Sequence, residues 1–222
     1  FIIGTTYLTY GLLLGSFIAF LVMRKKKANI LLNIGLLLLC LGVVHGTDYV
    51  VNHVLKPYQS ARILAVFHPE DYANDVAYQT MNSLKAIGHG GFSGRGYLQG
   101  ELTQLELVPE QFTDFIFCTI GEEHGWLGAT FVIGLYLTFL IRIVLIAERQ
   151  NAVFARVYGY SVASIFFFHF LINIGMEIGF LPVIGIPLPL LSYGGSSLLA
   201  FTILIFILLK LDMHRSETFA RV

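Results

Sequence analysis

Five apolar stretches, each about as long as a bilayer core is thick, constrain this chain more than any other feature. They lie at residues 1–23, 30–50, 115–147, 157–181 and 190–211. A helix needs about 20 apolar residues to cross the hydrocarbon core of a membrane. With 56% hydrophobic and 13% charged residues, the composition is too apolar for a soluble domain. The sequence therefore predicts an all-α membrane protein, a polytopic helical bundle with about five transmembrane helices.

Charged and turn-forming residues divide the chain into three parts. Residues 1–50 are expected to hold two transmembrane helices joined by a basic loop. Residues 51–112 are expected to form a large extracytoplasmic loop with interfacial helices, one opening near Pro57 and one over 77–87. Residues 113–222 would supply three more transmembrane helices.

A Pro/Gly-rich extracytoplasmic stretch at 179–197 interrupts the last part. Pro182, Pro187 and Pro189 prevent it from running as one helix. It either dips into the membrane and lines a cavity, or forms a plain turn between two spans.

Basic residues predict the orientation. If the spans alternate, most of them fall on one side of the membrane: Arg24, Lys25, Lys26, Lys27, Arg142, Arg149, Arg156, Lys210, Arg215 and Arg221. The positive-inside rule makes that side cytoplasmic, so the C-terminus is cytoplasmic and the large loop faces outward. Because Phe1 already lies in an apolar run, we expect the sequence to come from the interior of a longer protein.

Asp114 is the leading functional candidate, because it stands where a polar loop meets an apolar helix. An ionised side chain at a membrane boundary is costly and so indicates function. Thr113 and Asp114 are also favoured helix N-cap residues, and from the residues alone capping of the third span is the simpler interpretation. Both roles can coexist if Thr113 caps and Asp114 points into a cavity.

Other charged residues give weaker signals. Glu122 and Glu123 are expected in a structural polar network, with Glu122 the better candidate for a cavity wall. Arg62, Lys85 and Arg95 are outward cations that could bind an anion or pair with nearby acids. The glycines of 88–100 would let backbone N–H groups join Arg95 in an anion nest, although a tight turn cluster explains the same run.

Several sequence blocks together resemble the C-terminal half of the SEDS family (shape, elongation, division, sporulation), most like its RodA elongation type. The blocks are Pro57-Tyr58-Gln59 through Arg62-Ile63, Ala86-Ile87-Gly88 with Gly90-Gly91 and Gly94-Arg95-Gly96, Pro109-Glu110 with Thr113 to Phe117, Gly121-Glu122-Glu123, and Pro182 to Ser197. The chain departs from the family pattern at Asn82, His89, Glu101, Leu102 and Glu177.

The resemblance implies the last five helices of a ten-helix SEDS fold in the bacterial inner membrane, with the large loop periplasmic. It implies an inverting glycosyltransferase that polymerises lipid II into peptidoglycan strands during cell elongation and cell-shape maintenance. A class B penicillin-binding protein would be the partner, and no nucleic acid is involved. A lipid II flippase or transporter, or an inactive scaffold for a penicillin-binding protein, would also fit a bundle with broken apolar segments.

The same resemblance assigns roles to individual residues. Asp114 aligns with the family's candidate base, which takes the proton of a sugar 4-hydroxyl. The residues expected at the substrate are Arg62, Lys85, Arg95, Glu122, Ser192 and Ser196. Mg²⁺ or another divalent cation could assist at the diphosphate, with unassigned ligands and no organic cofactor.

Overall fold

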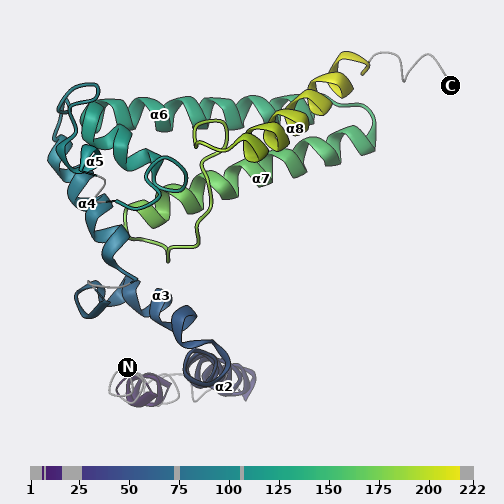
Figure 1. Ribbon diagram of the computed structural model, residues 1–222. Coiled ribbons are helices and arrows are strands. Elements are labelled where there is room, and N and C mark those ends of the chain that lie inside the picture. Colours follow the sequence, from purple (N-terminus) through teal and green to yellow (C-terminus); the bar gives the residue numbers. More distant parts are fainter. Residues whose placement is uncertain (1–6, 8, 17–26, 73–75, 106–107, 216–222) are drawn as a thin grey trace. The chain divides into compact units, whose positions relative to one another are not determined.

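The computed structural model describes residues 7, 9–16, 27–72, 76–105 and 108–215. No described residue lies in a β-strand, which confirms the all-α prediction. The chain divides into two units, Phe1–Ala61 and Arg62–Val222. Figure 1 shows the helices of both units.

In the first unit, α2 (Lys27–Tyr49) continues into a π-helical turn, η1 (Val50–Val54). The α2 helix corresponds to the predicted span at 30–50. Ser16 donates a side-chain hydrogen bond to Asn33 Oδ1 over 2.7 Å. Most of the predicted span at 1–23, and the basic residues Arg24 to Lys26, lie outside the described residues.

The periplasmic loop predicted at 51–112 contains short helices. They are α3 (Pro57–Phe67), the 3-10 turn η2 (Pro69–Tyr72), α4 (Tyr78–Gly90) and α5 (Glu101–Gln104). Pro57 is the first residue of α3, as predicted, because its fixed φ suits a first helical turn and the amide it lacks has no helical partner there. The helix predicted at 77–87 is α4.

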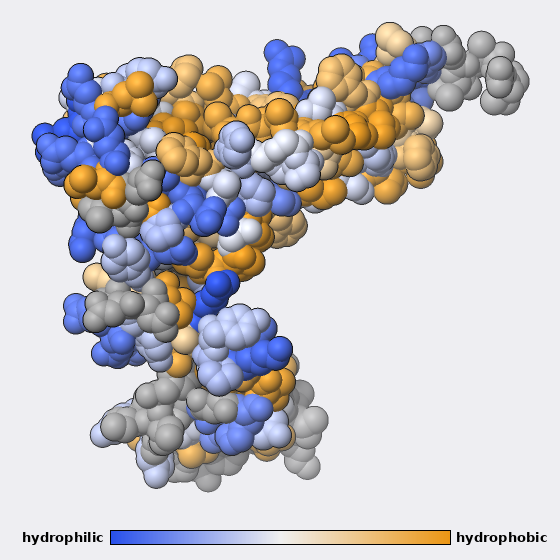
Figure 2. All heavy atoms as spheres, in the orientation of Figure 1, coloured by the Kyte–Doolittle hydropathy of each residue, from blue (hydrophilic) through white to orange (hydrophobic). Residues whose placement is uncertain are grey.

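Among the described residues, three helices are long and apolar enough to cross a membrane: α6 (Ile116–Glu148), α7 (Val153–Glu177) and α8 (Gly195–Met213). They correspond in position to the last three predicted spans. The α7 helix packs against both α6 and α8, and α4 packs against α6. Aromatic rings fill the core between the long helices, including Tyr136, Phe166, Phe170 and Phe201. In Figure 2 hydrophobic residues cover the length of these helices.

Polar side chains join the far ends of α6 and α8. Arg149 forms a bidentate ion pair with Asp212, and Gln150 Nε2 donates to Asp212 Oδ1 over 2.8 Å. These residues belong to the end of the bundle that the sequence predicts to be cytoplasmic. The pair holds that end of α8 against the end of α6.

Gly125 breaks α6 near its beginning. Its backbone (φ 63°, ψ −161°) is not helical, so the hydrogen-bond ladder is interrupted there. The glycine-rich loop after α4 fills the gap. Arg95 N and Gly96 N donate to the carbonyls of Glu122 and Glu123, each over 3.0 Å.

Two backbone N–H groups of α6 also donate hydrogen bonds to this loop. Trp126 N donates to Gly91 O over 2.9 Å, and Leu127 N donates to Phe92 O over 3.2 Å. Irregular backbone in a membrane bundle persists only where protein or water satisfies it, and here another stretch of backbone does so. The close approach requires glycine, since a Cβ on Gly125 would lie 2.3 Å from Gly94 N.

We expect Gly125→Ala to destabilise the full-length protein strongly. The positive φ alone costs about 1–3 kcal/mol for a residue with a side chain, and the clash with Gly94 adds to this cost. Thermal unfolding in detergent measures the effect. Gly88→Ala is the matched control, because a Cβ there meets nothing within 4 Å and alanine favours a helix. Equal melting temperatures for the two variants would contradict this account of the break.

Candidate active site

A tight turn immediately before α6 carries Asp114. Glu110 starts the turn with φ 58°, a value that is uncommon outside glycine. Its carbonyl accepts hydrogen bonds from the backbone N–H groups of Thr113 (3.2 Å), Asp114 (3.0 Å) and Phe115 (3.2 Å). Backbone bonds therefore set the position of Asp114, and its side chain is not needed to form the turn.

Neither Thr113 nor Asp114 caps α6, so the capping interpretation is wrong. The N-cap residue is Phe115, which makes no side-chain cap. Thr113 Oγ1 instead donates to the carbonyl and the carboxylate of Glu110. The cap comes from Glu177 at the end of α7, whose Oε1 accepts from Phe117 N over 3.2 Å. Local sequence motifs do not indicate this cap, because Glu177 lies 60 positions away from Phe117.

The Asp114 carboxylate is partly buried and faces Gly185. A Cβ at Gly185 would lie 3.0 Å from Asp114 Oδ2, so glycine leaves room for the carboxylate. Among the described residues this carboxylate forms no side-chain hydrogen bond. Burial, and secondarily the negative charge of Glu110, raise the pKa of Asp114 above its usual value. A raised pKa makes a carboxylate a better proton acceptor.

The Pro/Gly-rich stretch between α7 and α8 forms no helix over 178–194, as predicted. It runs beside the Asp114 turn. Tyr193 N donates to Phe112 O over 2.8 Å. Asn173 Nδ2 donates both to Asp114 O (2.7 Å) and to Ile186 O (2.8 Å). The stretch therefore forms the wall that faces Asp114.

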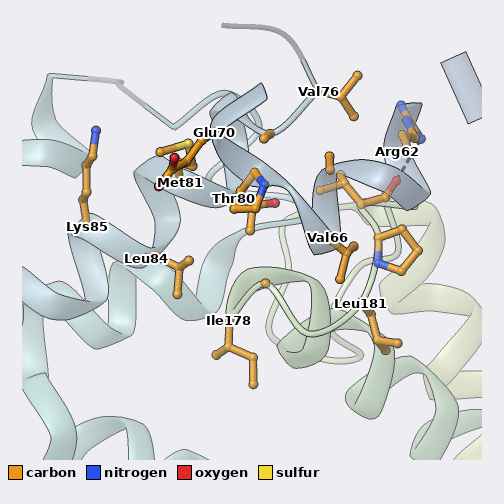
Figure 3. A pocket seen from close by; sticks show the side chains of 16 residues that line it. Arg62, Val66, Glu70, Val76, Thr80, Met81, Leu84, Lys85, Ile178 and Leu181 are labelled. Carbon is orange, nitrogen blue, oxygen red and sulfur yellow. Dashed lines mark hydrogen bonds between the residues drawn. The ribbon is translucent and has the colours of Figure 1, made fainter. Parts of the chain in front are cut away.

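Two of the three predicted cations border one cavity. Its volume is about 360 Å³, and α3, α4 and residues 178–183 line it. Figure 3 shows Arg62 and Lys85 on opposite sides of this cavity, with Glu70 between them. Arg62 Nη1 donates to Val183 O over 2.9 Å. Because Val183 packs in one core cluster with Phe115, the cavity wall reaches the residue next to Asp114.

Arg95 does not line this cavity, and its backbone is not available as an anion nest. The N–H groups of Gly94, Arg95 and Gly96 donate to the carbonyls of Gly90, Glu122 and Glu123. The Arg95 side chain donates from Nε to His89 O over 3.0 Å. The glycine run is thus the turn cluster that sequence analysis offered as the alternative to a phosphate loop.

Glu122 lies in a buried polar network and not on a cavity wall, which corrects that prediction. It is fully buried. Its two oxygens accept from Leu102 N and Thr103 N, each over 2.9 Å, and His89 Nδ1 lies 3.4 Å from Oε1. The carboxylate therefore fixes the start of α5, and the expectation of a structural polar network is confirmed for Glu122.

The two predicted serines differ in their surroundings. Ser192 Oγ accepts from Leu188 N over 2.7 Å, so Ser192 stabilises its own turn. Ser196 is exposed in the first turn of α8. A second, mostly apolar cavity of about 550 Å³ lies near them, lined by Phe112, Ile116, Leu190, Leu191, Ser192, Tyr193, Gly194, Gly195 and Leu198. Phe112 and Ile116, which lie two residues before and two residues after Asp114, are among the residues that line this cavity.

Sequence reasoning missed Asn173 and Gly185. Asn173 was hidden inside an apolar span, and only its polarity there could have indicated a role. Gly185 resembled the other glycines of its stretch. Both matter because they touch the backbone or the carboxylate of Asp114.

Taken together, the helices and the Asp114 turn define a polytopic membrane protein with a candidate base at one end of its bundle. The family model for cell cycle proteins of the FtsW, RodA and SpoVE type matches residues 3–217. The chain therefore belongs to this family, the SEDS family that its motifs resemble.

Curated relatives carry consistent names. The chain is 40% identical over 156 residues to the peptidoglycan glycosyltransferase RodA of Treponema pallidum, covering 70% of this chain and 36% of the relative. It is 39% identical over 162 residues to the peptidoglycan glycosyltransferase MrdB of Escherichia coli K12, covering 73% and 44%. A probable peptidoglycan glycosyltransferase FtsW of Thiomicrospira cyclica is 36% identical over 213 residues, covering 94% and 52%. The chain thus spans about half or less of these relatives.

A solved structure also matches. It is described as "Structural coordination of polymerization and crosslinking by a peptidoglycan synthase complex". The TM-score is 0.61 at 27% identity, covering 90% of this chain and 53% of that chain. The helical architecture is therefore that of a known membrane fold.

Removing the Glu122 carboxylate should loosen α5. Glu122→Ala leaves Leu102 N and Thr103 N without acceptors, and an unsatisfied buried donor costs about 1–3 kcal/mol. Hydrogen exchange of the full-length protein should show faster exchange at both amides. Asp71→Asn, on the exposed η2 turn, is the control and should leave them unchanged. Unaltered exchange in Glu122→Ala would show that the network does not hold α5.

Proposed function

We propose that this protein is a lipid II-dependent peptidoglycan glycosyltransferase that acts in cell elongation, with Asp114 as its base. One observation carries the proposal: a partly exposed carboxylate with a raised pKa and no side-chain hydrogen bond among the described residues lies at the end of the helical bundle. The names of the relatives support the reaction class.

The chemistry follows from the substrate. The 4-hydroxyl of an acceptor sugar attacks the anomeric carbon of a donor sugar, and a new C–O bond forms. The proton of the 4-hydroxyl passes to the Asp114 carboxylate. At the same time the bond between the anomeric carbon and the diphosphate oxygen breaks, and the lipid diphosphate leaves. Attack from the face opposite the leaving group inverts the anomeric centre. General base catalysis of this kind contributes about 10²- to 10⁴-fold.

The two cavities suit the rest of the substrate. Arg62 and Lys85 place positive charge at the cavity lined by α3 and α4, where a diphosphate would gain charge-assisted hydrogen bonds. The apolar cavity beside Phe112 and Ile116 suits a polyprenyl chain. Arg95 and Ser196 are exposed and remain predicted substrate contacts, and neither is among the residues that line the two cavities.

A divalent cation would depend on the substrate for most of its ligands. Among the described residues, no three His, Cys, Asp or Glu side chains are grouped closely enough to hold a metal. Mg²⁺ is often bound by one or two carboxylates together with substrate phosphates. The proposed requirement therefore rests on the diphosphate of lipid II.

The proposal also covers the location of the protein and its partner. We place the protein in the bacterial inner membrane, with the Asp114 end periplasmic and the Arg149–Asp212 end cytoplasmic. A class B penicillin-binding protein would crosslink the strands it makes. The match to a solved peptidoglycan synthase complex supports a partner of this kind.

Asp114→Asn should abolish strand synthesis, because an amide cannot accept the proton. We expect a loss of about 100-fold or more, measured as lengthening of glycan strands from lipid II by the full-length protein in detergent. Detergent removes the two leaflets that a flippase needs, so wild-type synthesis there separates the two functions. Asp71→Asn is the control and should retain activity. Full activity of Asp114→Asn would refute its role as base.

Glu110→Gln should shift the acid limb of the pH–rate profile to lower pH. The Glu110 charge raises the pKa of Asp114, so removing that charge lowers it. A base works only when deprotonated, and the variant therefore keeps its activity to lower pH than the wild type does. The measurement is the rate of strand synthesis against pH. An unchanged limb, or a shift to higher pH, would contradict the assignment.

A further inference from the structure

Two side chains one helical turn apart on α7 bind the short segment that carries Asp114. Asn173 and Glu177 are both fully buried. Residues four apart lie on one face of a helix. Asn173 Nδ2 donates a hydrogen bond to Asp114 O, and Glu177 Oε1 accepts one from Phe117 N. The α7 helix therefore holds this segment at two points.

Asn173 also fixes the opposite wall of the site. Both hydrogens of Nδ2 are used, one for Asp114 O and one for Ile186 O. Since both partners are carbonyls, which only accept, the orientation of the amide is determined. Ile186 follows Gly185, the residue that the Asp114 carboxylate faces. One amide group therefore ties the base to the wall in front of it.

Glu177 fixes the direction in which α6 begins. Its Oε1 takes the place of an N-cap side chain at Phe117 N. Ser83 Oγ in turn donates to Glu177 O over 3.1 Å, which joins this end of α7 to α4. Among the described residues Glu177 Oε2 has no partner. A buried carboxylate with one unused oxygen is expensive for packing alone.

We infer that Asn173 and Glu177 form a two-point clamp that positions Asp114 for proton transfer. The inference rests on the proposed function and assigns positioning residues to that same site. The clamp holds the backbone at Asp114 O and at Phe117 N, and Asn173 also sets the distance between this backbone and residues 185–186. A displacement of about 1 Å at a reacting group can cost about 100-fold in rate.

A clamp and a merely structural contact predict different kinetics. A positioning role lowers kcat and leaves KM for lipid II nearly unchanged, because substrate binding does not depend on the placement of the base. A structural role lowers the melting temperature and the amount of active protein without altering kcat per active molecule. The test therefore measures kcat, KM and melting temperature together in the full-length protein.

The variants exploit the chemistry of each contact. Asn173→Asp has the same shape but presents oxygens to two carbonyls, so we expect kcat to fall about 10- to 100-fold. Glu177→Leu removes the acceptor and should behave similarly. Glu177→Gln retains a carbonyl oxygen for Phe117 N and should stay within about 3-fold of wild type. Tyr158→Phe is the control, since it removes one hydrogen bond from α7 to α8 (3.1 Å to Leu204 O) far from the clamp.

Each outcome decides the inference. Reduced kcat in Asn173→Asp and Glu177→Leu, with rescue in Glu177→Gln and normal kcat in Tyr158→Phe, supports the clamp. Wild-type kcat in Asn173→Asp, or equal losses in both Glu177 variants, overturns it. If the wild-type protein itself makes no strands from lipid II, the proposed function fails instead, and the two failures are distinguishable.

Discussion

Backbone that leaves its helix inside a membrane bundle must find other partners, and this requirement organises the structure around the break at Gly125. Two carbonyls and two N–H groups of α6 lose their helical partners there, and the loop after α4 supplies all four. These four hydrogen bonds hold the glycine loop and the end of α4 against α6. It also explains why glycines cluster in this loop: a Cβ on Gly94 would lie 2.1 Å from Glu123 O.

The stretch between α7 and α8 also needs hydrogen-bond partners for its non-helical backbone, and here side chains supply them. Its carbonyls are bound one after another by residues from α3, α6 and α7. The pairs are Arg62 with Val183, Asn173 with Ile186, His169 with Pro187, and Tyr136 with Pro189. The three prolines of this stretch have no backbone N–H group, so the carbonyls around them need donors from other parts of the chain. Donor side chains on the helices are the matching solution, and they hold the wall of the site in one place.

Helix positions were predictable because they follow from the length of apolar runs. The spans at 115–147 and 157–181 correspond to α6 and α7, and Pro57 marked the start of α3. Asp114 could also be found, since a carboxylate at a membrane boundary is conspicuous. The sequence could not show which distant side chain forms a hydrogen bond with a given backbone group. Glu177 caps α6 across 60 positions, and a local motif scan sees only the neighbouring Thr113 and Asp114.

Three carboxylates near the start of α6 show how surroundings, and not residue type, decide a role. Glu122 has both oxygens bound by backbone N–H groups, so it serves the fold. Glu177 is enclosed, with one oxygen on the α6 backbone. Asp114 differs because the turn from Glu110 holds its backbone while its carboxylate stays partly exposed and unbound by side chains of the described residues. A base must be fixed in place and still have a free oxygen that a substrate can reach, and of the three only Asp114 meets both conditions.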